Sequence, residues 1–553
     1  MDHVLTIMFG LPGAGMQLRL DPLSLLFLVL LTPQMVAGAL AGEARSLTYW
    51  LFALGMVLAV TAASAFTLIF GFELMSAASW LLVLRGDQKP ATLYVGIAIF
   101  SAACLVPALF LPASSLAFVL VVLGAGAKAG LAPLHSWLPK AHPAPPAGVS
   151  ALMSGGMIKV ALSVIIREGF ITLDPALQPW WGNVLMTAGV ASVFIGALRA
   201  MLETEMKVLL ACSTVEHAGL IAVGLGLALR AKAMGDASLT ALGLEGALLC
   251  ALAHALYKPL LFIGAGEVKH ATGTASLDWL GGLMRSMPRL SGLMLLAASG
   301  MAALPLGPGF APEFLLLHAA LAAAGTGGIV ARIGFSALLA VLGLSAALAL
   351  GAAVKLIGVG FLGRPRSLQA AAAEEPGGLA LAGMALLGVL MVPLALVPGE
   401  VLRLMAPVVR ELAPNAALAP LGYAPLPLLG LGLMVAVGAG FGLHRFGVRG
   451  TRGAATWMGG FGKPPVWLPF GDPATQPTAT GFAEPVARAI GRGVLPDDAD
   501  PAELLVLAPL YRLHLKGVRL AEKLRRATIR ERLAFIFAAL VLFLLALGLL
   551  GGG

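Results

Sequence analysis

Charged side chains are scarce in this sequence. Asp, Glu, Lys and Arg together make up 11% of the 553 residues, against about 25% in ordinary soluble domains. Hydrophobic residues account for 59% of the chain, and long runs without any charge recur along it. This composition excludes an ordinary soluble globular domain and predicts an integral membrane protein.

Cysteine is scarce as well. The three cysteines, Cys104, Cys212 and Cys250, lie far apart in apolar stretches and form no CxxC pair. A disulfide framework and a ligand set for an iron–sulfur cluster are therefore excluded. The sequence also lacks the Walker and Rossmann patterns of nucleotide sites. We expect this chain to have no catalytic centre and to hold no cofactor or metal of its own.

Apolar runs of about 20 residues, the length of a membrane-spanning helix, occur about 14 times. The alternating ten-residue strands of a membrane barrel are absent, so we predict an all-α polytopic membrane protein. The predicted spans are Leu20–Ala41, Leu47–Ala65, Phe66–Leu84, Ala91–Pro112, Ser115–Pro139, Ala147–Arg167, Trp180–Ala197, Met206–Leu229, Thr240–Gly266, Leu290–Ala324, Ile329–Phe361, Leu379–Val397, Tyr423–Leu443 and Leu533–Leu550.

The formal net charge of +9 is interpreted as an orientation signal, because Lys and Arg gather in the cytoplasmic loops of membrane proteins. The connections that follow odd-numbered spans carry more Lys and Arg than the others. The long basic stretch from Arg445 to Arg532 falls on the same side. We therefore place these connections in the cytoplasm and both termini outside, and expect no nucleic-acid partner.

Proline and glycine interrupt two of the predicted spans at membrane depth. The first break runs from Pro133 to Pro146 and the second from Leu304 to Phe314. Helix breaks in corresponding positions of two halves are typical of transporters built from repeats. We therefore predict two inverted-repeat half-channels, each with one broken helix. The residues expected to break the helices are Pro133, Pro139, Pro305, Gly307 and Pro308.

The C-terminal part has a different pattern. A Gly-, Pro- and Thr-rich loop follows Leu443, and leucines then alternate with basic residues from Arg512 to Arg532. This mixture predicts an amphipathic helix on membrane lipids or on a partner subunit. The predicted division is N-terminal spans (1–65), a first half-channel bundle (66–197), a second (198–361), C-terminal spans (362–445), a cytoplasmic-side loop with the basic helix (446–532) and a terminal anchor span (533–553).

Several ionisable side chains lie inside predicted spans, where one charge costs about 2.5–3.5 kcal/mol to insert. Burial disfavours the charged form of lysine and glutamate alike, and an approaching opposite charge restores it. A row of such groups joined by water can therefore take up and release protons. The residues assigned to this relay are Glu73, Lys128, Lys159, Lys207, His254, Lys258 and Glu313, with Glu216, His217 and Lys355 as secondary candidates.

Simpler roles stay open for some of these side chains. Lys207 and Lys355 lie near the ends of their predicted spans, where a long side chain can reach the membrane interface. Glu216 and His217 are neighbours and could form a satisfied polar pair between packed helices. The sequence alone leaves these alternatives undecided.

The stretch GAGAKAGLAPLHSWLPKAHPAPPAGVSALMSGGMIKVALSVIIRE, residues 124–168, resembles the core motif of a known family. These are the antiporter-like, proton-translocating membrane subunits of respiratory complex I, Mrp cation/proton antiporters and energy-converting hydrogenases. The resemblance covers roughly residues 18–361. Members of the family normally have two more spans before the helix that begins with DPLS, here Asp21–Ser24. This difference in the number of N-terminal spans affects the expected contacts with partner subunits more than it affects the relay.

The resemblance implies a role for each relay residue. Glu73 and Lys128 would form the controlling ion pair of the first half-channel. Protons would then move laterally along the midplane of the membrane and exchange with one side at the end of the second half-channel. The lateral path is assigned to Lys159, His254 and Lys258, the start of the second half-channel to Lys207, and the terminal exchange to Glu313.

Two further motifs indicate one subgroup of this family. CSTVEHAGLIAVGLG and LLFIGAGEVKHATGTASLDWLGGLMRSMP look most like the large antiporter-like subunit of formate hydrogenlyase and hydrogenase-4, which are group-four NiFe hydrogenases. This resemblance implies the inner membrane of a bacterium or archaeon. It also implies other membrane-arm subunits and a peripheral redox arm as partners, with NiFe and iron–sulfur centres in those partners. The translocated ion would be the proton and possibly Na⁺.

Three alternatives stay open at this point. The chain could be part of a Mrp-type antiporter that exchanges Na⁺ for H⁺, or the membrane subunit of a bicarbonate-accumulating complex. It could also be a structural anchor with a disused relay. The retention of several costly buried charges argues against the anchor.

Overall fold

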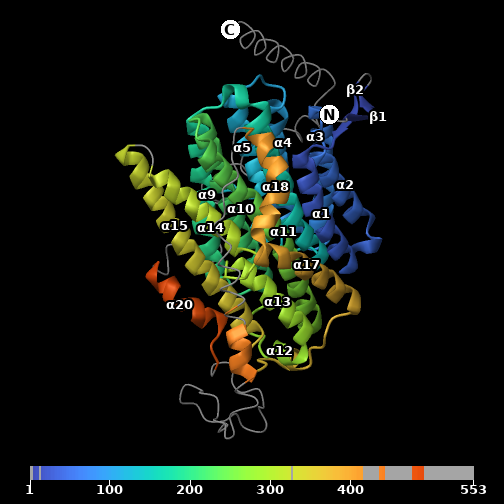
Figure 1. The fold of residues 1–553 in the computed structure, drawn as a ribbon. Coiled ribbons are helices and arrows are strands. Elements are labelled where there is room, and N and C mark those ends of the chain that lie inside the picture. The colour runs from blue at the N-terminus through green and yellow to red at the C-terminus, as the bar shows by residue number, and fades with distance from the viewer. Residues whose placement is uncertain are drawn as a thin grey trace, which may run out of the picture. The chain divides into compact units, whose positions relative to one another are not determined.

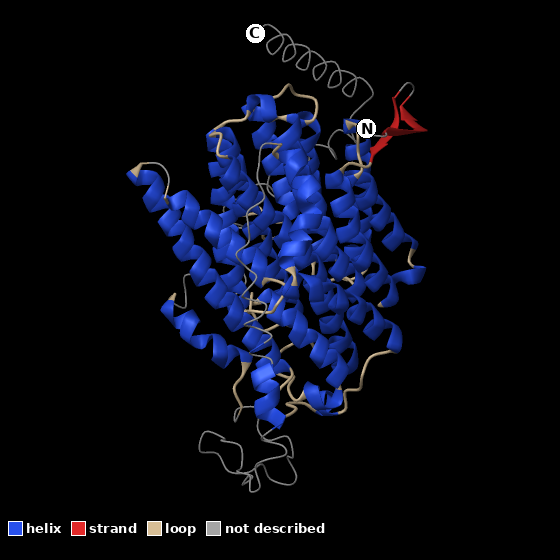
Figure 2. Cartoon of the chain, in the orientation of Figure 1, coloured by secondary structure: helices blue, strands red, loops and turns tan. Residues whose placement is uncertain are grey.

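The computed structural model of the chain describes residues 4–11, 14–325, 328–414, 432, 435–442 and 476–490. This part of the chain is predominantly helical, and its strands form one hairpin near the N-terminus (Figure 2). Nine of the described helices are long and apolar enough to cross a membrane, and three shorter apolar helices accompany them. The chain is thus a multi-pass helical membrane protein.

Short connections join most of the helices, so that sequence neighbours such as α2 and α3, or α9 and α10, pack side by side (Figure 1). The elements of the N-terminal half are β1 (Val4–Leu11), β2 (Ala14–Arg19), α1 (Pro22–Leu40), η1 (Glu43–Arg45), α2 (Leu47–Val60), α3 (Ala65–Leu84), α4 (Gln88–Ala108), α5 (Ser115–Ala129), α6 (Leu138–Ala141), α7 (Ala147–Leu152), η2 (Met153–Met157), α8 (Ile158–Arg167), η3 (Glu168–Thr172), η4 (Asp174–Ala176), α9 (Pro179–Leu202), α10 (Met206–Ala233) and α11 (Ala237–Thr272). The remaining elements are α12 (Leu283–Ser286), α13 (Pro288–Met301), α14 (Phe310–Ala324), α15 (Ile329–Val354), η5 (Lys355–Val359), α16 (Leu368–Ala371), α17 (Gly378–Leu396), α18 (Pro398–Leu412) and α20 (Ala479–Ala489).

The N-terminal hairpin is a departure from the all-α prediction. Strand β1 pairs antiparallel with β2, and the hairpin is fixed to the turn between α2 and α3. There the backbone N–H of Arg19 donates to the carbonyl of Thr61 over 2.7 Å. The segment is rich in β-branched and aromatic residues, which favour strands. A search for long apolar runs passes over it because each strand is short.

The first predicted helix break is confirmed. Helix α5 ends at Gly130, whose φ of +72° is a left-handed conformation that glycine adopts without strain. A non-helical stretch follows, which holds Pro133 after a cis peptide bond. Pro139 lies in the first turn of the short helix α6. The chain becomes helical again at Ala147 and continues through the π-helical segment η2 into α8.

The second predicted break is also present, inside the single span expected from Leu290 to Ala324. The chain forms two helices here, α13 and α14, separated by residues 302–309. Pro305, Gly307 and Pro308 all lie in this gap. Pro308 packs so closely on α13 that a Cβ on Gly300 would lie 2.7 Å from its Cγ. A longer side chain at Gly300 would therefore force the two half-helices apart.

Helices α10 and α11 carry half of the relay candidates and are buried along nearly their whole length. Helix α10 packs against α9, α11 and α14, and α11 packs against α1, α7, α13 and α17. They lie between α1–α3 on one side and α9, α14 and α15 on the other (Figure 1). Their polar side chains therefore face protein, where partners can hold them.

Helix α18 corrects the predicted topology, which treated residues 398–412 as a connection. Its buried residues include Leu402, Met405 and Val409, whereas Arg403 on the opposite face is exposed. The helix is too short and too charged to be recognised as a span, yet its apolar stripe packs on α1, α11 and α17. The other predicted spans up to Val397 each coincide with a described helix or pair of half-helices.

Some predictions fall outside the described residues. These are the anchor span Leu533–Leu550, the basic amphipathic helix and most of the span Tyr423–Leu443. The boundaries between the predicted domains stay predictions.

A charged clamp fixes the start of α1 to the end of α8. The guanidinium of Arg167 donates to both carboxylate oxygens of Asp21, over 2.6 and 2.9 Å, and Asp21 also caps α1 by accepting from the N–H of Ser24. Burial alone would raise the pKa of Asp21, but the hydrogen bonds from Arg167 and Ser24 lower it to about 2. The carboxylate therefore stays charged at every ordinary pH.

Replacing Asp21 by asparagine is expected to destabilise the purified chain by about 2 kcal/mol. At a pH above the pKa of Asp21 in both the folded and the unfolded chain, each unit by which folding lowers this pKa contributes about 1.4 kcal/mol of stability. This contribution is complete above the unfolded pKa and is lost only as the pH falls toward 2. The difference in melting temperature between wild type and Asp21→Asn in detergent should thus stay constant from about pH 8 to about pH 5. A difference that vanishes within that range would contradict the clamp.

Candidate functional site

Lys128 lies in the last turn of α5 and is completely buried. Its Nζ donates to the hydroxyl of Tyr94 on α4 over 2.7 Å and lies 4.4 Å from the centre of that ring. The same hydroxyl lies 2.6 Å from Oγ of Ser79 on α3. Because hydroxyls both donate and accept, this chain of groups can pass a proton from one oxygen to the next. Tyr94 and Ser79 were not predicted as site residues.

Glu73 lies half-buried on α3. Its charge and that of Lys128 act on each other. Within the described part of the chain, however, no ion pair within 4.0 Å joins the two side chains. Lys128 is therefore hydrogen-bonded to Tyr94, with Glu73 as a neighbouring charge.

Lys159 lies where α8 contacts α11. It lies on α8, and its Nζ contacts Nδ1 of His254 on α11 directly. It also donates to the carbonyl of Ser154, over 2.8 Å, in the π-helical segment before it. Because a lysine ammonium has no acceptor, a single proton is shared between Nζ and Nδ1. The contact is thus suited to proton transfer between α8 and α11.

Three rings continue the path from His254. The ring centres of His217 and His254 lie 5.2 Å apart, and Tyr257 lies 5.6 and 5.4 Å from them. Nδ1 of His217 lies 2.7 Å from the carbonyl of Ser213 and must donate to it. The other ring nitrogen of His217, Nε2, is therefore an acceptor in the neutral ring, and it has no hydrogen-bond partner.

Lys258 lies one turn beyond His254 on α11 and is completely buried. Its Nζ donates to Oγ of Ser213 and, over 3.3 Å, to the carbonyl of Leu210, both on α10. Glu216 follows on the same helix, buried to 1% exposure, and its Oε2 has no hydrogen-bond partner. The structure therefore brings the two predicted groups of α11 to the polar face of α10.

His142 is a site residue that the sequence analysis missed. It lies in the first helix break, completely buried between the rings of Trp137 and Phe262, 5.5 and 6.2 Å away. Neither of its ring nitrogens has a hydrogen-bond partner among the described residues, and the charges of Lys159 and Lys258 both act on it. The only signal in the sequence was a histidine between the prolines of the break.

Lys207 and Glu313 lie at the edges of this cluster. Lys207, in the first turn of α10, donates from Nζ to the carbonyl of Pro145 over 3.0 Å and so ties α10 to the first helix break. Glu313 lies half-buried in the first turn of α14, where the helix dipole favours a negative charge. Its charge acts on Glu216 of α10.

Lys355 has a set of partners that a relay does not require. Its Nζ donates to the carbonyls of Ala200, Met201 and Glu203, which lie at the C-terminal end of α9. These carbonyls have no partner within the helix, and a cation there is favoured by the helix dipole. We propose that Lys355 caps α9.

The expected result of Lys355→Met follows from this cap. The variant should lower the melting temperature of the purified chain, because buried carbonyls lose their donors, at a cost of about 1–3 kcal/mol. Proton translocation per assembled complex should stay within about twofold of wild type, since relay groups are untouched. Unchanged stability with lost translocation would place Lys355 in the relay.

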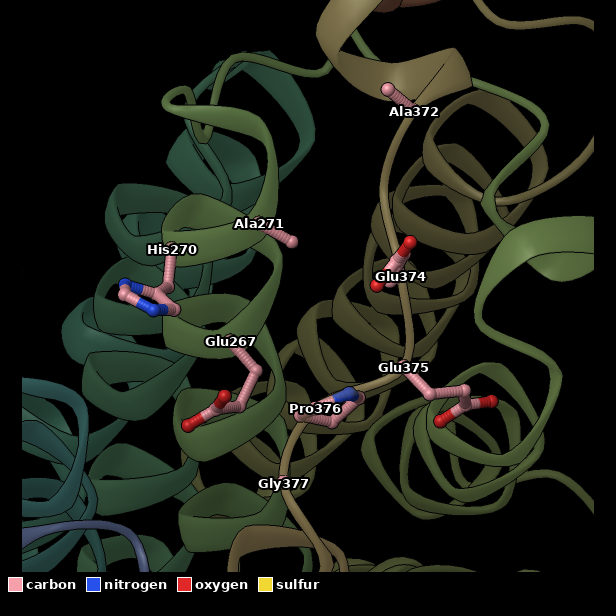
Figure 3. Close-up of a pocket in the computed structure, with 8 residues that line it drawn as sticks. All are labelled: Glu267, His270, Ala271, Ala372, Glu374, Glu375, Pro376 and Gly377. Carbon is pink, nitrogen blue, oxygen red and sulfur yellow. The ribbon is translucent and has the colours of Figure 1, made fainter.

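Among the described residues, no group of three or more His, Cys, Asp or Glu side chains could hold a metal ion. A surface pocket lies farther along α11, lined by Glu267 and His270 of that helix and by residues 372–377 (Figure 3). Glu375 points away from this pocket, and its carboxylate accepts from the N–H of Arg289. The pocket holds none of the predicted relay residues, so Glu267 offers a control position on the same helix.

The family described as NADH:quinone oxidoreductase/Mrp antiporter, transmembrane, matches residues 54–340. Hydrogenase-4 component B of Escherichia coli (strain K12) is 30% identical over 530 residues, which cover 85% of this chain and 78% of that protein. Formate hydrogenlyase subunit 3 of the same organism is 39% identical over 261 residues, 47% of this chain and 42% of that protein.

Two solved structures share the fold. A chain of the membrane-bound sulfane sulfur reductase, an archaeal respiratory membrane complex, superposes with a TM-score of 0.75 at 20% identity, covering 99% of this chain and 92% of that chain. A chain of the Mrp complex from Dietzia sp. DQ12-45-1b superposes with a TM-score of 0.64 at 22% identity, covering 77% and 89%. At these identities the structures show a common fold and no more.

Proposed function

Because this chain belongs to the NADH:quinone oxidoreductase/Mrp antiporter transmembrane family, we propose that it moves protons through the membrane as one subunit of a larger complex. The driving reaction is a redox reaction in neighbouring subunits of hydrogenase or formate hydrogenlyase type. The relay comprises Glu73, Lys128, His142, Lys159, Lys207, His217, His254, Lys258, Glu216 and Glu313.

The observation that carries this proposal is a row of buried ionisable side chains with unpartnered polar atoms. These atoms are both ring nitrogens of His142, Nε2 of His217, Nε2 of His254 and Oε2 of Glu216. Buried polar atoms in folded proteins almost always have a partner, and water supplies it where protein does not. Water molecules bound to these unpartnered atoms, next to the lysines, would therefore form a hydrated path for protons. A purely structural cluster would satisfy its atoms internally.

The proposed transfer at the centre is a simple exchange. When Lys159 carries three protons, Nζ donates to Nδ1 of His254, and the neutral ring keeps its own proton on Nε2. Transfer of the shared proton leaves a neutral amine and a doubly protonated ring. The ring then releases its Nε2 proton toward the unpartnered Nε2 of His217. The contact is reset when the remaining ring proton of His254 returns from Nδ1 to Nε2, by tautomer exchange or ring rotation, and a second proton reaches Lys159.

The names of the relatives support a redox-driven complex, since they are a hydrogenase-4 component and a formate hydrogenlyase subunit. In this proposal the partners are other membrane-arm subunits and a peripheral arm, and the NiFe and iron–sulfur centres lie in those partners. The chain would lie in the inner membrane of a bacterium or archaeon, with the connections after odd-numbered spans in the cytoplasm.

A second candidate is Na⁺/H⁺ exchange in a Mrp-type antiporter. The family name includes the Mrp antiporters, and a Mrp chain shares the fold. The relay residues would be the same, but an ion gradient rather than a redox reaction would drive them.

Gentle purification from the native membrane separates these functions. Mass spectrometry would identify the co-purifying subunits, and a metal assay on the same sample would measure nickel and iron. A hydrogenase-like subunit with both metals is the expected result. Small antiporter subunits without redox metal would establish the second candidate. A large soluble zinc protein would favour a bicarbonate-accumulating complex instead.

The Lys128→Ala variant tests the relay itself. The complex, reconstituted in liposomes with an internal pH-sensitive dye, should translocate protons about tenfold more slowly than wild type, since a positioned proton-transfer group is lost. Glu267→Gln on α11 is the control, because it neutralises an acid outside the relay, and it should match wild type. Wild-type translocation by a fully assembled Lys128→Ala complex would refute the assignment.

A further inference from the structure

We propose that Gln34 on α1 is a positioning residue that holds a water molecule against the π-helical segment η2, beside Lys159. The inference rests on the proton relay proposed above. It adds to that relay a residue of the N-terminal helices, which the predicted division of the chain leaves outside both half-channels.

Gln34 is a polar side chain completely buried in an apolar helix. Its Nε2 donates to the carbonyl of Leu30 over 2.9 Å, which satisfies one end of the amide. Its Oε1 accepts no hydrogen bond from any described residue. A buried amide oxygen without a donor destabilises the folded chain. A donor that is not part of the chain, which in a polar site is water, removes this cost.

The unpartnered oxygen points at the place where three helices meet. A Cβ on Gly155 of η2 would lie 2.1 Å from Oε1 of Gln34 and 2.4 Å from Cγ of Pro259 on α11. Helices α1 and α11 thus approach η2 at the same residue. The absence of a side chain at Gly155 is what permits this approach.

Two interruptions of helical hydrogen bonding lie at this junction. In η2 the i→i+5 pattern loosens the helix next to Gly155, and the carbonyl of Ser154 accepts from Nζ of Lys159 over 2.8 Å. In α11 Pro259 has no N–H, so it gives no helical hydrogen bond to the carbonyl of Ala255. Acceptors therefore gather at the junction, and a water molecule can donate one proton to Oε1 of Gln34 and one to a second acceptor.

Such a water has free lone pairs, and these make it an acceptor for Lys159. The amide of Gln34 does not titrate, so it can hold the water in one place whether Lys159 is charged or neutral. A carboxylate at this position would instead pair with the lysine. Gln34 thus positions a proton acceptor without competing for the proton.

The direct test is a cryo-electron microscopy map of the intact complex at a resolution that shows ordered water. Wild type should have a water peak within hydrogen-bonding distance of Oε1 of Gln34, and the Gln34→Met complex should lack it. A wild-type map that resolves other buried waters but shows none at Oε1 would overturn the proposal. This measurement does not depend on proton translocation.

The functional test uses matched variants of α1. Gln34→Met keeps the length of the side chain and removes its acceptor, and it should slow proton translocation about fivefold and shift its pH profile. Gln34→Asn keeps an uncharged amide oxygen that can accept from the water, and it should retain more of the rate than Gln34→Met. Thr32→Val removes an exposed hydroxyl from the same helix and should match wild type.

The outcomes separate this inference from the relay. If Lys159→Ala abolishes translocation while Gln34→Met behaves as wild type, the relay stands and the role of Gln34 is refuted. If both variants translocate protons at the wild-type rate, the proposed function itself fails. A Gln34→Met complex that slows without a shift in pH profile, together with a Gln34→Asn complex that is just as slow, would show a packing role only.

Discussion

Lys159→Arg is expected to abolish proton translocation as completely as Lys159→Ala, with a fall of about a hundredfold or more in each. Lys159 contacts Nδ1 of His254 directly, so it is the link between α8 and α11. An arginine keeps the positive charge and can reach the same acceptors. It cannot release its proton, however, because the guanidinium stays protonated at every accessible pH.

This pair of variants distinguishes a relay from a structural charge. If Lys159 served only to satisfy the carbonyl of Ser154, arginine would replace it with modest loss. The measurement is the initial rate of pH change in liposomes that contain the reconstituted complex, normalised to assembled complex on a native gel. Glu267→Gln again serves as the control. Substantial translocation by Lys159→Arg would exclude proton release at this position.

Charge in an apolar run is conspicuous, so the sequence alone draws attention to the ionisable residues assigned to the relay. Lys128, Lys159, His254 and Lys258 stand out against their surroundings, and the structure shows all four completely or almost completely buried. The uncharged members were missed for the same reason. Tyr94 and Gln34 are ordinary residues in an apolar helix until their contacts are known.

Lys355 shows what a linear pattern cannot distinguish. A lysine inside a span can belong to a proton path or can bind the carbonyls that end a neighbouring helix. The difference lies in residues 200–203, about 150 positions earlier in the chain. Such a contact between distant parts of the chain has no counterpart in local spacing.

The helix breaks were predictable because proline and glycine act locally. Pro133 and Pro308 lie in gaps where several prolines and glycines cluster, whereas a single proline such as Pro259 lies within a continuous helix. Helix α18 was not predicted because its apolar stripe needs the surfaces of α1, α11 and α17, and the N-terminal hairpin was not predicted because each of its strands is short. The positions of the helix breaks could thus be predicted from the sequence, whereas the elements that pack against each other could not.

In the proposed relay, the proton step beyond Lys258 requires one acid, Glu216. Glu216 is 1% exposed on α10, and its Oε2 has no hydrogen-bond partner among the described residues. The neighbouring His217 uses Nδ1 to donate to the carbonyl of Ser213 and lies 4.0 Å from the carboxylate. A satisfied polar pair, the simpler alternative left open by the sequence, would require the two side chains to bind each other.

Glu216→Gln should therefore slow proton translocation by about a hundredfold, because the amide has the same shape and cannot carry a proton. Glu216→Asp keeps a titratable group and should retain measurable translocation, limited by its shorter reach. The rates would be measured in the liposome assay at several pH values. If Glu216→Gln translocates protons like wild type, protons leave Lys258 by another route, and Glu216 is held in the core for packing alone.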